Sequence, residues 1–208
     1  MAGVHFRRRI AGRRSAEELT LAQEIEIKFA LKDRRALVQK LREIGAQRLY
    51  EETFEDNIVL DRRGELRTKG ALLRVRKFGR YAIATFKGPM AFESGVKTRE
   101  EVQTAVESFE LAIQLFDALG FKPTFRYQKY REVWRVRDVE VVLDRTPIGD
   151  YFEIEGALDL IRSVAEELGM NVEQGIRQSY ADLYRQHRRT RADLPENMVF
   201  PPEQLPSA

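Results

Sequence analysis

Hydrophobic and polar residues alternate along several stretches of the chain, and the first clear one is QEIEIKFAL at residues 23–31. A period of two places Glu24, Glu26 and Lys28 on one face of a β-strand and the apolar residues between them on the other face. Similar strand patterns occur in residues 50–61, 70–89, 96–106, 125–136, 139–144 and 151–156. The pattern therefore predicts about eight strands, most of them paired in antiparallel hairpins.

Apolar residues at helical spacing predict four helices between and after these strands. Asp33 is a candidate N-cap for the first helix, which Gly45 closes, and Ser108 and Gly120 bound the second helix in the same way. Two more helices are expected around residues 159–168 and 176–187, and residues 89–95 are expected to form a loop. Together the elements predict an α+β fold in which helices cover an antiparallel sheet.

Charges of both signs share one face of the alternating strands. The residues with this parity are Glu24, Glu26, Lys28, Arg74, Arg76, Lys87, Lys97, Arg99, Glu101, Lys129, Arg131, Asp144, Glu153 and Glu155. In any one strand, an ordinary solvated face of an antiparallel sheet explains the charges. Arg and Glu crowd this face, however, while neutral polar residues are scarce on it. This composition favours a sheet that curls with its charges inward, where a polyanion and divalent cations would partner them.

Composition narrows the chemistry of such a site. The net charge is only +3, which argues against a surface built for nucleic acid, although a local basic field remains compatible with it. Cysteine is absent and His5 and His187 are the only histidines, which excludes disulfides and thiolate metal sites and argues against an imidazole site. Any metal is therefore expected to be bound by carboxylates, which favours Mg²⁺ or Mn²⁺.

The two ends of the chain differ from the part between them. Residues 1–21 are rich in arginine and lack the apolar segment of a signal peptide, so we expect a flexible basic arm rather than a leader. A domain is predicted over residues 22–188, and residues 189–208 form a proline-rich tail that either lies on the domain or is disordered. Because no segment approaches the ~20 apolar residues of a membrane helix, a cytoplasmic location without a membrane partner is expected.

The charged strands resemble a known family. EIEIK at residues 24–28 is similar to the ExExK signature of the CYTH domain, the family of class IV adenylate cyclases and thiamine triphosphatases, also called triphosphate tunnel metalloenzymes. The further motifs LLRVR (72–76), TFKGP (85–89), KTREE (97–101), KYR (129–131) and LDRTPIGDYFEIE (143–155) follow in the family's order and spacing. The resemblance covers residues 22–185. It implies a closed eight-stranded antiparallel β-barrel, the triphosphate tunnel, with covering helices.

The resemblance also implies a role for each charged residue. It implies Mg²⁺ or Mn²⁺, with two ions expected, bound by Glu24, Glu26, Glu101, Asp144, Glu153 and Glu155. It implies triphosphate binding by Lys28, Arg74, Arg76, Lys87, Arg99, Lys129 and Arg131. The implied catalytic residues are Lys87, Glu26 and Glu153. Lys97 is expected to be exposed, Trp134 to lie in the core rather than to stack on a base, and Gly149 to permit the turn before Glu153.

Two reactions are open within this family. The closing strand and the helix before KYR look closer to class IV adenylate cyclases, which convert ATP to 3′,5′-cyclic AMP and pyrophosphate. The alternative is a triphosphatase acting on tripolyphosphate, thiamine triphosphate or a nucleoside triphosphate. The family's aromatic pair in a DNxYFD-like segment is replaced here by Val59 and Leu60, so base recognition is expected to differ if that pair shapes a nucleoside pocket.

A different class of function is a non-catalytic module that binds polyphosphate or triphosphate-ended RNA. We disfavour it because a mere anion binder has no use for six inward carboxylates. A nucleic-acid partner is not expected for the chain as a whole. The oligomeric state is open, with a homodimer as one expectation.

Overall fold

The computed structural model describes residues 22–93, 96–191 and 193–206, so the predicted N-terminal arm lies outside the described residues. The chain divides into two compact units. Among the described residues, the first unit comprises 22–23, Glu55–Met90 and Arg99–Tyr127, and the second comprises Glu24–Phe54, Ala91–Thr98 and the described residues from Gln128 onward.

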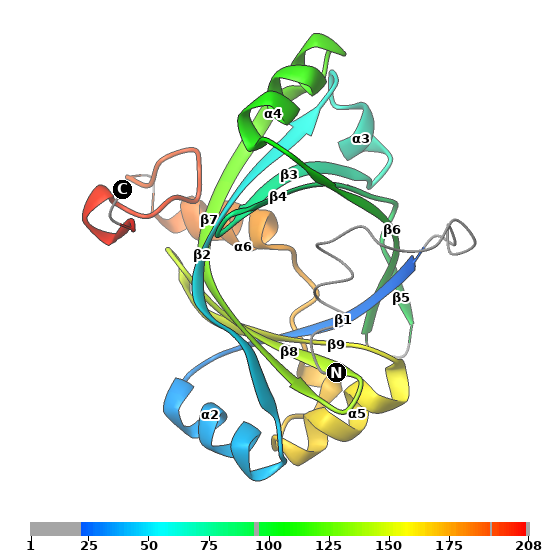
Figure 1. Ribbon diagram of the computed structural model, residues 1–208, viewed down its shortest axis with the longest axis vertical. Helices are drawn as coiled ribbons and strands as arrows, with labels where there is room; N and C mark the ends of the chain where they lie inside the picture. The colour runs from blue at the N-terminus through cyan, green and yellow to red at the C-terminus, as the bar shows by residue number, and fades with distance from the viewer. Residues whose placement is uncertain (1–21, 94–95, 192, 207–208) are drawn as a thin grey trace. The chain divides into compact units, whose positions relative to one another are not determined.

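All the described strands belong to one sheet, whose elements are labelled in Figure 1. The strands are β1 (Ala22–Ala30), β2 (Gln47–Asp61), β3 (Leu72–Phe78), β4 (Tyr81–Lys87), β5 (Ala91–Glu93), β6 (Val96–Val106), β7 (Lys122–Val136), β8 (Val139–Thr146) and β9 (Gly149–Glu155). Their order is β1–β9–β8–β7–β2–β3–β4–β6, and a further pairing of β6 with β1 closes these eight strands into a ring. The predicted eight-stranded antiparallel β-barrel with covering helices is confirmed.

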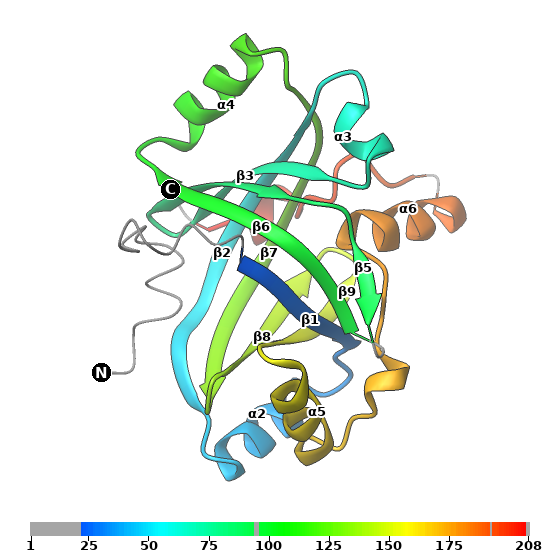
Figure 2. The same ribbon diagram turned by 90° about the vertical axis from the view of Figure 1, so that its right-hand side faces the viewer.

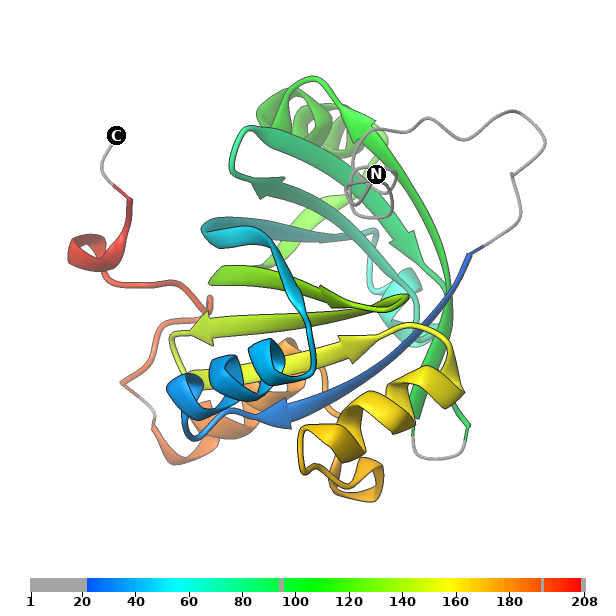
Figure 3. The same cartoon turned by 60° about the horizontal axis from the view of Figure 1, so that its bottom comes forward.

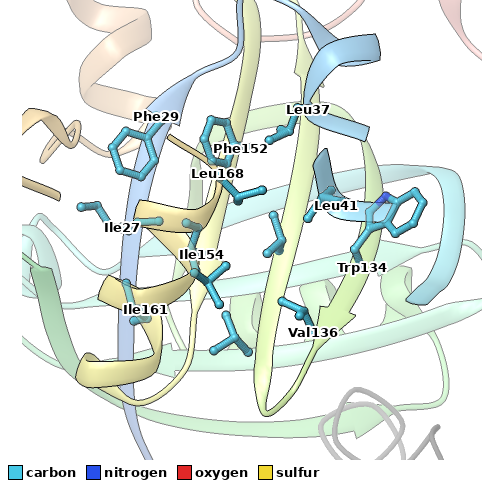
Figure 4. Packing of buried hydrophobic residues seen from close by; sticks show 14 of the residues in the cluster. Ile27, Phe29, Leu37, Leu41, Trp134, Val136, Phe152, Ile154, Ile161 and Leu168 are labelled. Carbon is cyan, nitrogen blue, oxygen red and sulfur yellow. The ribbon is translucent and has the colours of Figure 1, made fainter. Parts of the chain in front are cut away.

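The second unit packs its apolar strand face against two helices. α2 (Arg34–Glu43) begins at Asp33, whose Oδ1 accepts a hydrogen bond from the amide of Ala36 at 2.9 Å, and α5 (Leu158–Glu167) packs on β8 and β9. Figure 3 shows both helices in front of β1 and β9. The residues that pack together in Figure 4 include Ile27, Phe29, Leu37, Leu41, Trp134, Phe152, Ile154 and Ile161. The apolar parity of the strands therefore forms the core, as the alternation predicts.

The first unit has a smaller core of the same kind. α4 (Phe109–Ala118) begins at Ser108, whose Oγ accepts a hydrogen bond from the amide of Leu111, and it packs on β3 and β4. Figure 2 shows α4 and the short α3 (Glu65–Thr68) near β3. The buried residues of this core are Leu60, Leu73, Val75 and Ala112. The cap predicted at Ser108 is confirmed.

The C-terminal segment lies along β7 within the second unit. α6 (Tyr180–Thr190) begins with a capping box between Ser179 and Asp182. Beyond the helix, the amide of Gln128 donates to the carbonyl of Met198 at 2.8 Å, and the amide of Phe200 donates to Oε1 of Gln128 at 3.1 Å. Met198 and Phe200 are buried. The described part of the C-terminal tail therefore lies on the domain, which is one of the two expectations for it.

Several short elements were not expected, among them β5, α3 and the 3₁₀ turns Val172–Gln174 and Pro202–Gln204. The predicted loop at residues 89–95 contains β5, which pairs with β6, and α3 has only four residues. α3 forms because both carboxylate oxygens of Asp61 accept hydrogen bonds, from the amides of Leu66 and Arg67 at 3.1 Å each. Such short elements show no hydrophobic period. Among the helices that the structure describes, none has the length and apolar character needed to span a bilayer, and the cytoplasmic location stays a prediction.

Candidate functional site

The strand face that carries the charges is buried in both units, and each unit holds a cluster of its own. We call the set in the second unit the Asp144 cluster: Lys28, Lys129, Arg131, Asp144, Glu153 and Tyr180. We call the set in the first unit the Arg74 cluster: Glu55, Arg74, Arg76, Lys87, Arg99, Glu101 and Tyr127. Cross-strand register explains the grouping, because Lys28 lies opposite Glu153, Arg131 opposite Asp144, and Lys87 opposite Glu101.

Asp144 is the centre of the Asp144 cluster, and its side chain is 0% exposed. Its Oδ1 accepts a hydrogen bond from Nε of Arg131 at 2.7 Å. Its Oδ2 accepts three, from Nη2 of Arg131 at 2.6 Å, from Nζ of Lys129 at 3.0 Å and from the hydroxyl of Tyr180 at 2.7 Å. A buried carboxylate with this many charged donors fixes the positions of the two bases.

Glu153 connects Lys28 to the other members of the Asp144 cluster. Its Oε1 lies 3.3 Å from Nζ of Lys28, and its Oε2 accepts a hydrogen bond from Nη2 of Arg131 at 2.7 Å. Nζ of Lys28 also donates to the carbonyl of Gln178 at 3.2 Å. Arg131 therefore bridges two acids, and Lys28 is held between a strand and the segment that leads into α6.

Tyr180 is a member of this cluster that the sequence analysis missed. Nζ of Lys28 lies 4.1 Å from the centre of its ring and Nζ of Lys129 lies 5.0 Å away, both within the range of a cation–π contact. Burial, together with the negative charges of Asp144 and Glu153, raises the pKa of Tyr180 well above its ordinary value, so the hydroxyl is a neutral donor. The capping box at Ser179 was the available signal, because it fixes Tyr180 as the first residue of the helix.

The Arg74 cluster is built on the β3–β4 hairpin and its two neighbours. Nζ of Lys87 lies 2.8 Å from Oε2 of Glu101, and Arg99 donates from Nε to the carbonyl of Gly88 at 3.0 Å. Nη1 of Arg76 lies 3.6 Å from Oε2 of Glu55, a fully buried acid that the resemblance did not point to. The hairpin predicted around Gly79 thus brings Arg74, Arg76 and Lys87 to one face.

Arg74 lies beside an aromatic ring, since its Nη1 donates to the hydroxyl of Tyr127 at 3.0 Å. Burial alone lowers the pKa of Arg74, but its interactions with Tyr127 and Glu55 outweigh burial and raise the pKa above the ordinary value. The guanidinium therefore keeps its charge although the residue is buried. Tyr127 shares the parity of Lys129 and Arg131 on β7, and this parity was the signal that could have revealed it.

Each cluster has more bases than acids among its named members. The Arg74 cluster has four bases, Arg74, Arg76, Lys87 and Arg99, beside the acids Glu55 and Glu101. The Asp144 cluster has three bases, Lys28, Lys129 and Arg131, beside Asp144 and Glu153. Guanidinium and ammonium groups gathered on one buried face match the negatively charged oxygens of a polyanion. Both clusters are therefore suited to negatively charged ligands.

Other residues singled out in the sequence lie as follows. Val59 lies opposite Arg74 on the charged face, whereas Leu60 lies opposite Leu73 and is buried in the apolar core, so the two do not act as a pair on one surface. Trp134 is buried in the core with its Nε1 donating to Glu132 at 2.7 Å, as expected. Gly149, the first residue of β9 directly after the turn, has a φ of 127°, which an L side chain rarely adopts.

The predicted metal ligands are acids of the right chemical type, although their roles remain predictions. Glu26 lies directly opposite Glu155 across β1 and β9, and two adjacent carboxylates favour a hard divalent cation between them. Asp144, Glu153 and Glu101 are engaged by bases instead. In the described part of the chain, no group of three or more acidic or histidine side chains is arranged to hold a metal ion. The side chains of Glu24 and Lys97 lie outside what the structure describes.

The fold and the two clusters define a class of protein, the antiparallel β-barrels whose charged strand face is suited to a polyanion. The CYTH domain model matches residues 22–183. The chain therefore belongs to the CYTH domain family.

Three relatives illustrate the similarity. “Putative adenylate cyclase MJ0240” of Methanocaldococcus jannaschii is 28% identical over 174 residues, which are 77% of this chain and 97% of that protein. A solved Vibrio parahaemolyticus protein with the same provisional description has a TM-score of 0.71 at 17% identity, covering 80% of this chain and 99% of its own. HpAC1 of Hippeastrum, a provisional adenylyl cyclase described as having a dominant triphosphatase activity, has a TM-score of 0.60 at 16% identity, covering 79% and 96%. At these identities the two solved structures support the fold.

Proposed function

We propose that this chain is a triphosphate-processing CYTH enzyme whose reaction converts ATP to 3′,5′-cyclic AMP and pyrophosphate. The observation that carries the proposal is the gathering of bases on the inward strand face, four in the Arg74 cluster and three in the Asp144 cluster. A triphosphate carries several negative charges on a short chain, so it can partner several of these bases at once. Membership of the CYTH family and the name of the relative from Methanocaldococcus jannaschii support the same substrate class.

The bases have different chemical uses in this proposal. Arg74 and Arg76 present planar guanidinium groups, which suit two-point contacts with phosphate oxygens. Lys87 supplies a compact charge that can stabilise the negative charge that develops as the phosphorus–oxygen bond breaks. Lys129 and Arg131 are already held in place by Asp144, so binding a phosphate there would need little reordering of their side chains.

The facing acids Glu26 and Glu155 would hold the metal, for which we propose Mg²⁺ or Mn²⁺, with two ions as the expectation. Their donors are all carboxylate oxygens, the ligands that these ions prefer. When bound, a divalent cation would neutralise phosphate charge and polarise a phosphoryl oxygen. The register of Glu26 against Glu155 supports this location.

The alternative reaction is hydrolysis of tripolyphosphate, thiamine triphosphate or a nucleoside triphosphate. HpAC1 supports this alternative, because it has the same fold and a similar provisional name and is described as having a dominant triphosphatase activity. A non-catalytic module that binds polyphosphate or triphosphate-ended RNA is the third candidate. It is disfavoured because buried acids accompany the bases in both clusters.

The product formed from ATP tests the proposal. Purified protein is incubated with ATP and with tripolyphosphate, each with Mg²⁺, with Mn²⁺ and with excess chelator, and cyclic AMP, pyrophosphate and orthophosphate are quantified. We expect cyclic AMP and pyrophosphate in equal amounts, and loss of both in chelator. The variant Arg76→Ala, purified in the same way, should lose most of this turnover, which rules out a contaminating cyclase.

Two other results would change the assignment. Orthophosphate without cyclic AMP, together with faster turnover of tripolyphosphate than of ATP, would replace the cyclase by a triphosphatase. If neither compound were turned over under any of the metal conditions, while tripolyphosphate still bound, the enzyme proposal would fail in favour of the binding module.

A further inference from the structure

A row of polar residues crosses the charged face of the first unit beside the Arg74 cluster. The register places Val59 of β2 opposite Arg74 of β3, Arg74 opposite Thr85 of β4, and Thr85 opposite Gln103 of β6. Asn57 lies two residues before Val59 on the same face. Directly opposed residues on neighbouring strands have Cβ atoms about 5 Å apart, so these side chains are neighbours.

Several polar atoms in this row are buried without a hydrogen-bond partner. They are Oδ1 of Asn57, Oγ1 of Thr85, Oε1 of Gln103 and Nε of Arg74. Asn57 and Thr85 are 0% exposed. A buried polar atom without a partner costs about 1–3 kcal/mol, and native proteins contain few of them. Four in one row therefore call for a ligand.

The orientation of the Asn57 amide follows from its contacts. Its Nδ2 donates to Oε1 of Glu55 at 3.1 Å and lies 3.4 Å from the carbonyl oxygen of Tyr127. The reverse orientation would place the amide oxygen against a carboxylate and a carbonyl, with no proton between them. The unpartnered atom of Asn57 is therefore the oxygen, which accepts hydrogen bonds.

The chemistry of these atoms distinguishes among ligands. Oδ1 of Asn57 and Oε1 of Gln103 are acceptors, and the hydroxyl of Thr85 can accept as well as donate. The oxygens of an ionised triphosphate are acceptors too, so the phosphates cannot satisfy the amide oxygen of Asn57, whose orientation its contacts fix. A group with N–H or O–H donors can do so, and Val59 adds an apolar surface in the same row. Small-molecule sites typically combine an apolar wall with a few convergent polar groups in this way.

We propose that Asn57, Thr85 and Gln103 form a subsite for the nucleoside part of a nucleoside triphosphate, with its hydroxyl and amino groups as the donors. The inference rests on the proposed function, since it places the organic group of the substrate next to the triphosphate-binding arginines. It gives the chain a means of preferring an organic triphosphate over tripolyphosphate. It also extends this recognition from Asn57, in the same β2 segment as Val59 and Leu60, to Thr85 on β4 and Gln103 on β6.

Equilibrium binding tests the subsite independently of turnover. Isothermal titration in excess chelator would measure the Kd of ATP and of tripolyphosphate for the wild type, Thr85→Val and Gln103→Leu. We expect each variant to weaken ATP binding about tenfold, the effect of one lost hydrogen bond in a buried site, and to leave tripolyphosphate binding unchanged. Thr85→Ser, which restores the hydroxyl, should regain the preference for ATP.

The matched control is Thr104→Val on β6, because Thr104 is exposed on the opposite face of the sheet and should affect neither ligand. Equal weakening of both ligands by Thr85→Val would overturn the proposal, because the row would then only support Arg74. Unchanged binding of both ligands would also overturn it, because water would then satisfy these atoms. A wild type that prefers ATP through Thr85 but yields no product would instead refute the proposed reaction and leave the subsite in place.

Discussion

The two charged clusters differ in how completely their groups are satisfied within their own unit. In the Asp144 cluster, both oxygens of the central carboxylate accept hydrogen bonds, and Arg131 bridges it to Glu153. In the Arg74 cluster and the row beside it, buried atoms of Asn57, Thr85 and Arg74 have no hydrogen-bond partner. The central carboxylate of the first arrangement is fully engaged before a ligand arrives, whereas the second leaves buried polar atoms that a ligand can engage.

This difference between the two clusters distinguishes buried charges that stabilise the fold from buried charges that bind a ligand. A complete network orders its side chains before a ligand arrives, and the removal of one member leaves the others buried and unbalanced. The row beside Arg74 has fewer internal hydrogen bonds to lose on substitution, because several of its buried atoms have no hydrogen-bond partner. Substitutions in the Asp144 cluster should therefore act mainly on folding, and those in the Arg74 cluster mainly on binding and turnover.

The largest effect is expected for Asp144→Asn. The amide keeps the shape but loses the charge that balances Lys129 and Arg131, so we expect the free energy of unfolding to fall by about 3–5 kcal/mol. Denaturant titration would measure it, with Asp138→Asn in an exposed turn of the same unit as the control. A loss no greater than that of Asp138→Asn would show that the network does not stabilise the fold.

Lys87→Ala should act on the reaction instead. We expect kcat for ATP to fall tenfold or more, because the charge that stabilises the transition state is removed, while the unfolding midpoint changes less than for Asp144→Asn. Steady-state kinetics of product formation would measure the first quantity and thermal unfolding the second. Lys77→Ala, which removes an exposed lysine on the opposite face of β3, is the control. If the two alanine variants had the same kcat, Lys87 would have no part in the chemistry.

Tyr180→Phe should produce the smallest of these effects. The ring and its contacts with Lys28 and Lys129 remain, and one hydrogen bond to Asp144 is lost, so we expect a decrease of about 1–1.5 kcal/mol in the free energy of unfolding. Tyr81→Phe, whose hydroxyl accepts only from the exposed Arg80 in the described contacts, is the comparison in denaturant titration. A smaller loss for Tyr180→Phe than for Tyr81→Phe would contradict a complete network around Asp144.

Strand parity predicted much of the candidate site. It placed Lys28, Arg131 and Asp144 on one face and Ile27 and Phe152 on the other, because the side-chain period of a strand does not depend on the rest of the fold. It did not single out Tyr127 and Glu55, although both have the charged parity, since neither belongs to a motif of the resemblance. Tyr180 comes from a helix, and strand parity says nothing about which helix residues reach a sheet.

The sequence alone determined the fold class, the strand and helix order, the N-caps at Asp33 and Ser108, and the family, because these depend on local patterns and motif spacing. Only the tertiary structure decided which charges meet. Val59 and Leu60 lie on opposite faces of β2, so they do not act together. Asp144 is engaged by Tyr180, a residue distant from it in the sequence. Hydrogen-bond partners are set by cross-strand register and helix packing, and both are fixed only when the chain folds.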